Sequence, residues 1–161
     1  MEITLTTSLS AVLAQVAQSS AYTGAKRQDN PASQDPQAYE RISTVDEDDP
    51  ELTHFFNEAR IPLAAFFASE LASEGLVSEG TGAGDTYNLV LRVHDGFNQA
   101  LLPAMVYNLF SYFVNSILAS WLLYTHRDDA TIYAGAAQSL LESLHGATIR
   151  RCFTRKMSPF E

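Results

Sequence analysis

The chain has 161 residues, the length of one ordinary domain, and 46% of them are apolar, which is enough for a core. Its net charge of −9 argues against a nucleic-acid-binding protein, because such proteins need a basic face. The single cysteine, Cys152, excludes an intrachain disulfide, and residues 1–5 lack the layout of a signal peptide, so we expect one cytosolic domain spanning residues 1–161.

The first helix is predicted from residue 9, because apolar residues recur at positions 9, 12, 13 and 16. Thr6, Thr7 or Ser8 can supply the N-cap hydroxyl, and residues 2–5 can be extended. Residues 23–43 lose the helical period and contain two prolines among many small polar residues. We therefore predict an exposed linker or arm over residues 23–43.

The second helix has the clearest start signals of the chain. Asp49 suits the N-cap, Pro50 suits the first helical position, and apolar residues then repeat at helical spacing. Pro62 interrupts this pattern, so a kink or break is expected near residues 60–61. Gly75 is the predicted C-terminal stop.

A strand is predicted over residues 87–93, where apolar Tyr87, Leu89 and Leu91 alternate with other side chains. It follows a glycine-rich turn, residues 76–86, which lacks the Lys-Ser/Thr ending of a phosphate-binding loop. A strand on its own leaves its hydrogen-bonding groups unpaired. Its partner is therefore residues 76–79, residues 2–5 or another subunit.

Two further helices are predicted, one opening at Asn98 and the other capped by Asp128 or Asp129. The turn between them is short, so they should form an antiparallel hairpin. No acidic or basic residue lies between positions 96 and 125, which is long enough for a membrane span. A membrane-associated protein anchored by residues 97–124 is therefore one alternative.

A polar stripe on this apolar helix favours a buried central helix instead. Asn108, Ser111 and Asn115 share one face, and the flanks carry no one-sided cluster of Lys or Arg. Buried amides need hydrogen-bond partners, so we expect this stripe at a helix–helix or subunit contact and no membrane partner.

Together these elements predict a mainly α-helical fold. We expect a bundle of about four helices with a long central helix hairpin, a small β element and a long loop or arm. The predicted core consists of large apolar side chains from all three later helices: Phe56, Phe66, Leu109, Phe113, Trp121, Leu140 and Leu144.

No residue set in the sequence has the spacing of a catalytic, cofactor or metal site. The acidic run at residues 46–49 lacks the alternating ligands and central glycine of a calcium loop, and acids are favoured at a helix start in any case. His54 and Glu58 lie one helical turn apart and can touch, but two groups do not make a metal site. We expect no cofactor and no enzymatic activity.

Charge is distributed unevenly along the chain. Residues 40–58 hold seven acids and one base, whereas Arg150, Arg151, Arg155 and Lys156 follow the last predicted helix. Basic residues suit a helix C-terminus for dipole reasons alone. The alternative is that the acidic end of one subunit meets the basic end of the next, a contact that generates a ring if it closes.

The order of these motifs resembles a known family. Residues 42–49 (ISTVDEDD) lead into the second helix, residues 87–93 (YNLVLRV) form the strand, residues 117–122 (ILASWL) lie in the long helix, and Arg150-Arg151 ends the last one. Over residues 42–152 this resembles the small head–tail connector (neck or adaptor) proteins of tailed phages and prophages.

The resemblance implies a non-enzymatic virion assembly component. Such a subunit would form a homo-oligomeric ring between the portal and tail proteins, with DNA passing without specific contacts, in the host cytoplasm and then in the virion. Residues expected at subunit contacts come from the two charged ends and the strand: Asp46, Asp48, Asp49, Arg150, Arg151, Tyr87, Leu89 and Leu91.

A small helical ligand-binding domain is the remaining alternative. Its pocket would lie between the second and third helices and would be lined by phenylalanines, namely Phe55, Phe56, Phe66 and Phe67.

Overall fold

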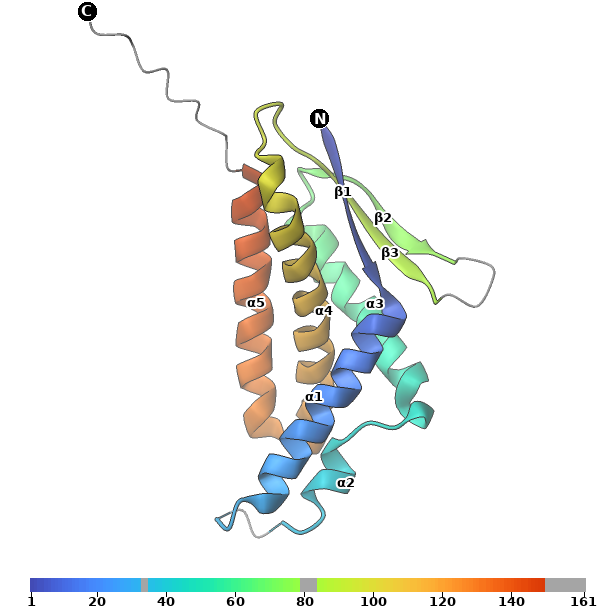
Figure 1. Ribbon diagram of the computed structural model, residues 1–161, viewed down its shortest axis with the longest axis vertical. Coiled ribbons are helices and arrows are strands. Elements are labelled where there is room, and N and C mark those ends of the chain that lie inside the picture. Colours follow the sequence, from blue (N-terminus) through green and yellow to red (C-terminus); the bar gives the residue numbers. More distant parts are fainter. Residues whose placement is uncertain (33–34, 79–83, 150–161) are drawn as a thin grey trace, which may run out of the picture.

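The computed structural model describes residues 1–32, 35–78 and 84–149. It shows a mainly α-helical protein in which a small antiparallel sheet covers part of a helical bundle, as predicted (Figure 1). In chain order the elements are β1 (Glu2–Ser8), α1 (Leu9–Asp29), α2 (Ala38–Ile42), the 3₁₀ turn η1 (Asp46–Asp48), α3 (Asp49–Phe66), β2 (Leu71–Val77), β3 (Thr86–Arg92), the 3₁₀ turn η2 (Gln99–Leu101), α4 (Leu102–Thr125) and α5 (Arg127–Ile149).

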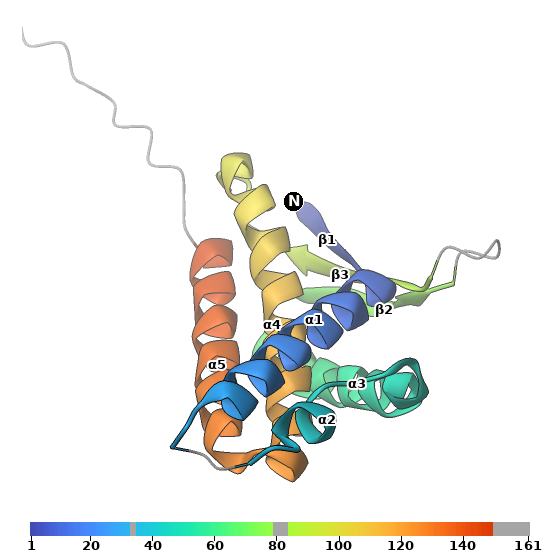
Figure 2. The same ribbon diagram turned by 60° about the horizontal axis from the view of Figure 1, so that its bottom comes forward.

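Helix α1 starts as predicted but continues much further. The Ser8 hydroxyl accepts a hydrogen bond from the Ala11 N–H at 3.5 Å, which caps the helix. The prediction of a patternless arm over residues 23–43 is wrong, because α1 runs to Asp29 and the chain then folds back into α2 (Figure 2). Gly24 allows the two helices to approach, since a Cβ there would lie 3.0 Å from the Tyr39 Cα.

Helix α3 begins at Asp49, with Pro50 in its first turn as predicted, but the N-cap is Asp48 and not Asp49. No break occurs at Pro62, and the helix continues to Phe66. Pro62 removes the hydrogen bond to the Glu58 carbonyl, but both residues are exposed, so water can satisfy that carbonyl. The prediction that Gly75 ends this helix is wrong, because Gly75 lies inside β2.

The sheet has the strand order β1-β3-β2, so β3 lies in the centre. Leu5 pairs with Leu89 across one side of β3, and Leu76 pairs with Tyr87 across the other, both antiparallel. Of the three partners considered for this strand, residues 2–5 are used within β1. Of the second, residues 76–79, only 76 and 77 pair with it among the described residues, because β2 begins at Leu71 and ends at Val77. A neighbouring subunit is not required to complete the hydrogen bonding of β3.

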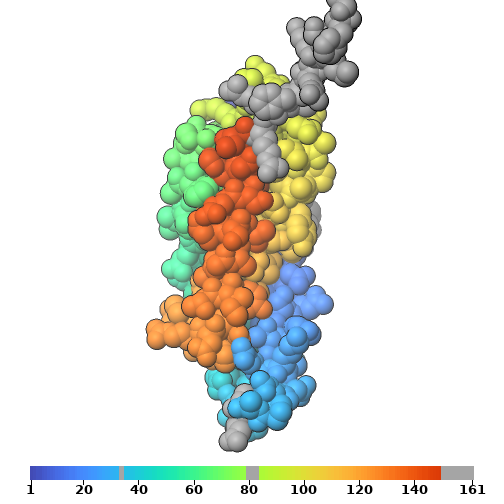
Figure 3. All heavy atoms as spheres, turned by 90° about the vertical axis from the view of Figure 1, so that its left-hand side faces the viewer, coloured from blue at the N-terminus to red at the C-terminus, as the bar shows by residue number. Residues whose placement is uncertain are grey.

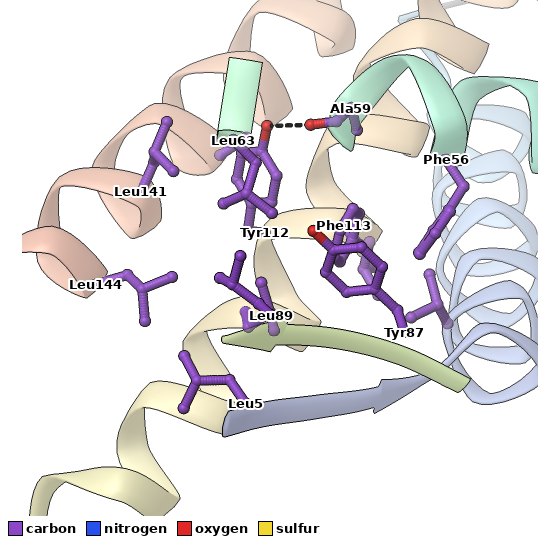
Figure 4. Close-up of a cluster of buried hydrophobic side chains, with 14 of the residues drawn as sticks. Leu5, Phe56, Ala59, Leu63, Tyr87, Leu89, Tyr112, Phe113, Leu141 and Leu144 are labelled. Carbon is purple, nitrogen blue, oxygen red and sulfur yellow. Dashed lines mark hydrogen bonds between the residues drawn. The ribbon is translucent and has the colours of Figure 1, made fainter. Parts of the chain in front are cut away.

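The inner face of the sheet packs on α4, and together they form the core. The Tyr87 ring packs against Phe113 of α4 with ring centres 5.0 Å apart, and Leu5 and Leu89 are buried in the same cluster (Figure 4). Helix α4 also packs on α1, α3 and, most extensively, on α5, with which it forms the predicted antiparallel hairpin (Figure 1). The inward-facing side chains of the strands, which alternate along the chain, therefore pack against the apolar face of α4, which repeats every 3.6 residues, in one apolar layer.

Burial accounts for part of the apolar composition of α4, since 39% of its most apolar stretch is buried. Among the described residues, one helical stretch, Gln99–Thr125, is long and apolar enough to cross a membrane, with a mean hydropathy of 1.4. The central helix of a globular core has the same composition, because several elements cover it on different sides.

Six of the seven predicted core residues pack in the core. Phe56, Leu109, Phe113 and Leu144 are fully buried, and Trp121 and Leu140 are half-buried against the same cluster. The assignment of Phe66 is wrong. It is 37% exposed, at the end of α3, where the next residue, Phe67, enters the core instead.

Candidate assembly interface

The acidic segment around the start of α3 lies on the surface. Asp48 accepts a hydrogen bond from the Val45 N–H at 2.8 Å, which fixes the turn that precedes the helix. Asp46, Glu47 and Asp49 are exposed, and within the described residues none of the three forms an ion pair. The fold thus leaves several carboxylates of this segment available to a partner.

The basic residues predicted to meet this segment, Arg150 and Arg151, lie outside the described residues. They directly follow Ile149, where α5 ends. Figure 1 shows that α5 ends at the opposite end of the molecule from α2 and the start of α3. The acidic segment and the point where the basic segment leaves the fold are therefore far apart within one subunit.

The strand residues predicted to contact a neighbour do not lie at the surface. Tyr87, Leu89 and Leu91 are completely buried in the central strand. Figure 4 shows Tyr87 and Leu89 facing the protein's own helices. Their assignment to a subunit contact is wrong for this reason. The apolar alternation that identified the strand also marked the face that is buried. From the sequence alone, a face buried by the protein's own helices cannot be distinguished from a face covered by another chain.

The prediction of a helix–helix contact for the polar stripe of α4 is confirmed for one of its three residues. Asn108 Nδ2 lies 3.4 Å from the Ser143 Oγ of α5. Asn115 Nδ2 donates to the Ser111 carbonyl at 2.7 Å, and both residues line a groove beside α1. This groove continues toward Lys26, whose Nζ lies 4.9 Å above the Tyr22 ring.

A second groove runs on the other side of α5. Figure 3 shows α5 in front, with α3 on one side and α1 on the other. Between α3 and α5 the hollow has a volume of about 310 Å³. Its floor is α4, and small side chains dominate its lining: Ala59, Ser116, Ala119, Ser120, Ala134 and Ala137, with Phe55, Glu58, Pro62, Tyr112, Gln138 and Leu141 completing it.

This groove differs from the phenylalanine-lined pocket considered in the sequence analysis. Of the four phenylalanines proposed for that pocket, Phe55 alone lines the groove, and Phe56 and Phe67 are buried in the core. Tyr112 forms part of its floor, and its hydroxyl donates to the Ala59 carbonyl at 2.9 Å. The groove therefore presents a lining of mainly small side chains between two helices.

Partly buried ion pairs hold elements of the fold together. Arg60 of α3 contacts Glu74 of β2 through two hydrogen bonds of 3.0 Å, and its guanidinium lies 5.6 Å from the Tyr87 ring centre. Arg27 of α1 likewise binds the buried Asp129 of α5. These pairs join residues distant in sequence, so no local pattern could have predicted them.

The titration of the buried tyrosines follows from the same packing. Burial, and then the negative charge of Glu74, raise the pKa of Tyr87 above its ordinary value. Burial also raises the pKa of Tyr112. Neither group is poised to exchange a proton near neutral pH.

The geometry of a metal site is not found in the described part of the chain. His54 Nε2 and Glu58 Oε1 do touch, at 3.3 Å, as their spacing predicted. Across residues 1–32, 35–78 and 84–149 no three His, Cys, Asp or Glu side chains are grouped to hold an ion. The surface features that stand out are the acidic segment and the two grooves beside α5.

Comparison with known proteins yields no relative. No family model, no curated protein and no solved structure matches the chain.

Proposed function

We propose that this protein is a non-enzymatic assembly subunit of the head–tail connector type, which forms a ring between a portal and a tail. The observation that carries the proposal is the separation of charge along the molecule. Exposed carboxylates such as Asp46 and Asp49, without ion pairs among the described residues, lie at the start of α3, in the half of the molecule that contains α2 (Figure 1). Arg150 and Arg151 directly follow Ile149 in the sequence, and α5 ends there in the opposite half of the molecule from α2 (Figure 1).

Opposite charges at opposite ends favour a head-to-tail contact. A contact between two different patches repeats from subunit to subunit, and it gives a closed ring when the rotation between neighbours closes. Complementary charge would fix the register and speed the encounter of subunits. In such a ring the remaining negative charge would repel passing DNA, so the channel would not bind the genome it transmits.

Reversal of the basic end tests this contact. We expect the variant R150E/R151E to remain monomeric under conditions in which the unmodified chain assembles. The matched control is R92E/R127E, which changes the net charge equally at two other exposed arginines. Mass measured by light scattering should separate the two variants, while far-UV circular dichroism checks that both are folded.

A charge swap provides the second arm of the test. Addition of D46R/D49R to the R150E/R151E chain restores opposite charges with the signs exchanged, and it should restore assembly. If R150E/R151E assembles as well as the control at low salt, the head-to-tail charge contact is wrong. If the swap fails while its fold is intact, these carboxylates are not the partners of the two arginines.

A further inference from the structure

The groove between α3 and α5 has the chemistry of a site for a basic peptide with aromatic side chains. Its floor and walls are mainly apolar, with Phe55, Pro62 and Leu141 among them. Two exposed carboxylates stand at its edges. Glu58 lines the α3 side, and Glu142 on α5 accepts a hydrogen bond at 3.0 Å from Gln138, which lines the other side.

We propose that this groove binds residues 150–161 of a neighbouring copy of the chain, an inference that rests on the proposed function. That segment, RRCFTRKMSPFE, combines four basic residues with Phe153, Met157 and Phe160. The groove volume is about 310 Å³. A cavity of about 150 Å³ holds benzene, so the groove has room for both phenyl rings.

Charge distinguishes this groove from the one on the other side of α5. The α1 groove carries Lys26 at its rim, which would repel a basic segment. Among the described residues, the lining of the α3 groove contains no Lys or Arg. The imidazole of His54 lies 3.3 Å from the Glu58 carboxylate. A peptide with four positive charges therefore fits the α3 side better.

The course of α5 favours a groove on a second copy. The helix ends at Ile149, eight residues beyond Leu141 at the groove, which is about 12 Å of helix. To reach its own groove the chain would have to reverse at the end of α5. In a head-to-tail ring, the segment continues instead toward the end of the next subunit where the acidic residues lie.

The single cysteine of the chain makes a direct test possible. Cys152 lies beside Phe153, and Gln138 is an exposed residue in the groove wall, so Q138C in the full chain places a second thiol there. A disulfide forms when the two Cα atoms come within about 4.4–6.8 Å. The matched control is S139C, the next residue of α5, which is exposed and does not line the groove.

After oxidation with diamide, we expect Q138C to give a ladder of covalent multimers on a non-reducing gel, and S139C to stay largely monomeric. An excess of a synthetic peptide with the sequence of residues 150–161, with serine in place of its cysteine, should suppress the ladder. The same peptide with both phenylalanines replaced by alanine should suppress it far less.

Three results would overturn the proposal. An intrachain disulfide, visible as a faster-migrating monomer of Q138C, would place the segment in its own groove. Equal ladders for Q138C and S139C would show non-specific contact, and no disulfide in either would remove the site. If light scattering still shows an oligomer in any of these cases, the proposed function stands and only the occupant of the groove is wrong.

Discussion

The ion pair between Arg60 and Glu74 should hold α3, one wall of the α3–α5 groove, against the sheet. The two side chains are 24% and 23% exposed. Removing one partner of a fully buried pair costs about 3–5 kcal/mol, and an exposed pair contributes only about 0.2–1 kcal/mol. Arg60→Met should therefore lower the free energy of unfolding by about 2 kcal/mol, because it leaves the carboxylate of Glu74 without its partner.

A double-mutant cycle isolates this pair from the packing of its aliphatic parts. Urea unfolding followed by far-UV circular dichroism would be measured for Arg60→Met, Glu74→Met and the double variant. The double variant should lose about 1–2 kcal/mol less than the sum of the single losses, because it leaves no charge unpaired. A coupling energy below about 0.5 kcal/mol would refute the claim that this pair anchors α3 to the sheet.

Further predictions concern single buried groups. Tyr112→Phe should cost about 1 kcal/mol, because its hydroxyl donates to a backbone carbonyl at 2.9 Å. An unchanged free energy of unfolding in urea would contradict this. The raised pKa of Tyr87 keeps it neutral in the folded protein while it ionises in the unfolded chain. The stability it contributes is therefore complete below about pH 10 and declines above that pH, and its phenolate absorbance should appear only as the protein unfolds. Gly24→Ala should destabilise the protein by about 1 kcal/mol, because overpacking against the α2 backbone outweighs the gain in helix propensity. Gly135→Ala, with open space around it, should stabilise the protein by about 0.5–1 kcal/mol. The midpoints of thermal unfolding of the two variants should therefore shift in opposite directions. Trp121→Phe removes an indole hydrogen bond of 2.7 Å to the last residue of α2. It should therefore cost about 1 kcal/mol of stability and increase amide hydrogen exchange in α2. Unchanged exchange in α2 would contradict the claim that Trp121 holds this helix in place.

Periodicity in the sequence identified the elements whose burial follows a simple repeat. The stripe of α4 and the alternation around Leu89 both mark faces that meet in one core. The strand partners stayed open, because pairing depends on which edges tertiary packing brings together. Residues 71–77 show most clearly what periodicity cannot predict. Their sequence, Leu-Ala-Ser-Glu-Gly-Leu-Val, continues the composition of the preceding helix, yet pairing with β3 makes it a strand.

Long-range contacts explain why residues 23–43 were misassigned. Small and polar residues continue α1 to Asp29, and α2 is held by its two buried residues, Ala38 and Ile42, packed against the end of the α4–α5 hairpin. Two buried residues in five show no period that sequence reasoning can detect. The acidic segment is exposed around the start of α3, as its composition indicated. Both grooves depend on how the helices are placed relative to one another, so no sequence pattern indicated them.

The mass of the unmodified chain in solution tests the central claim most directly. Light scattering would be recorded across a range of concentrations, at low salt and again at about 1 M salt, where charges are screened beyond about 3 Å. A head-to-tail ring predicts a discrete oligomer at low salt, of one mass over a range of concentrations, that dissociates when salt is raised. A monomer at every concentration and salt would contradict a self-assembling connector subunit.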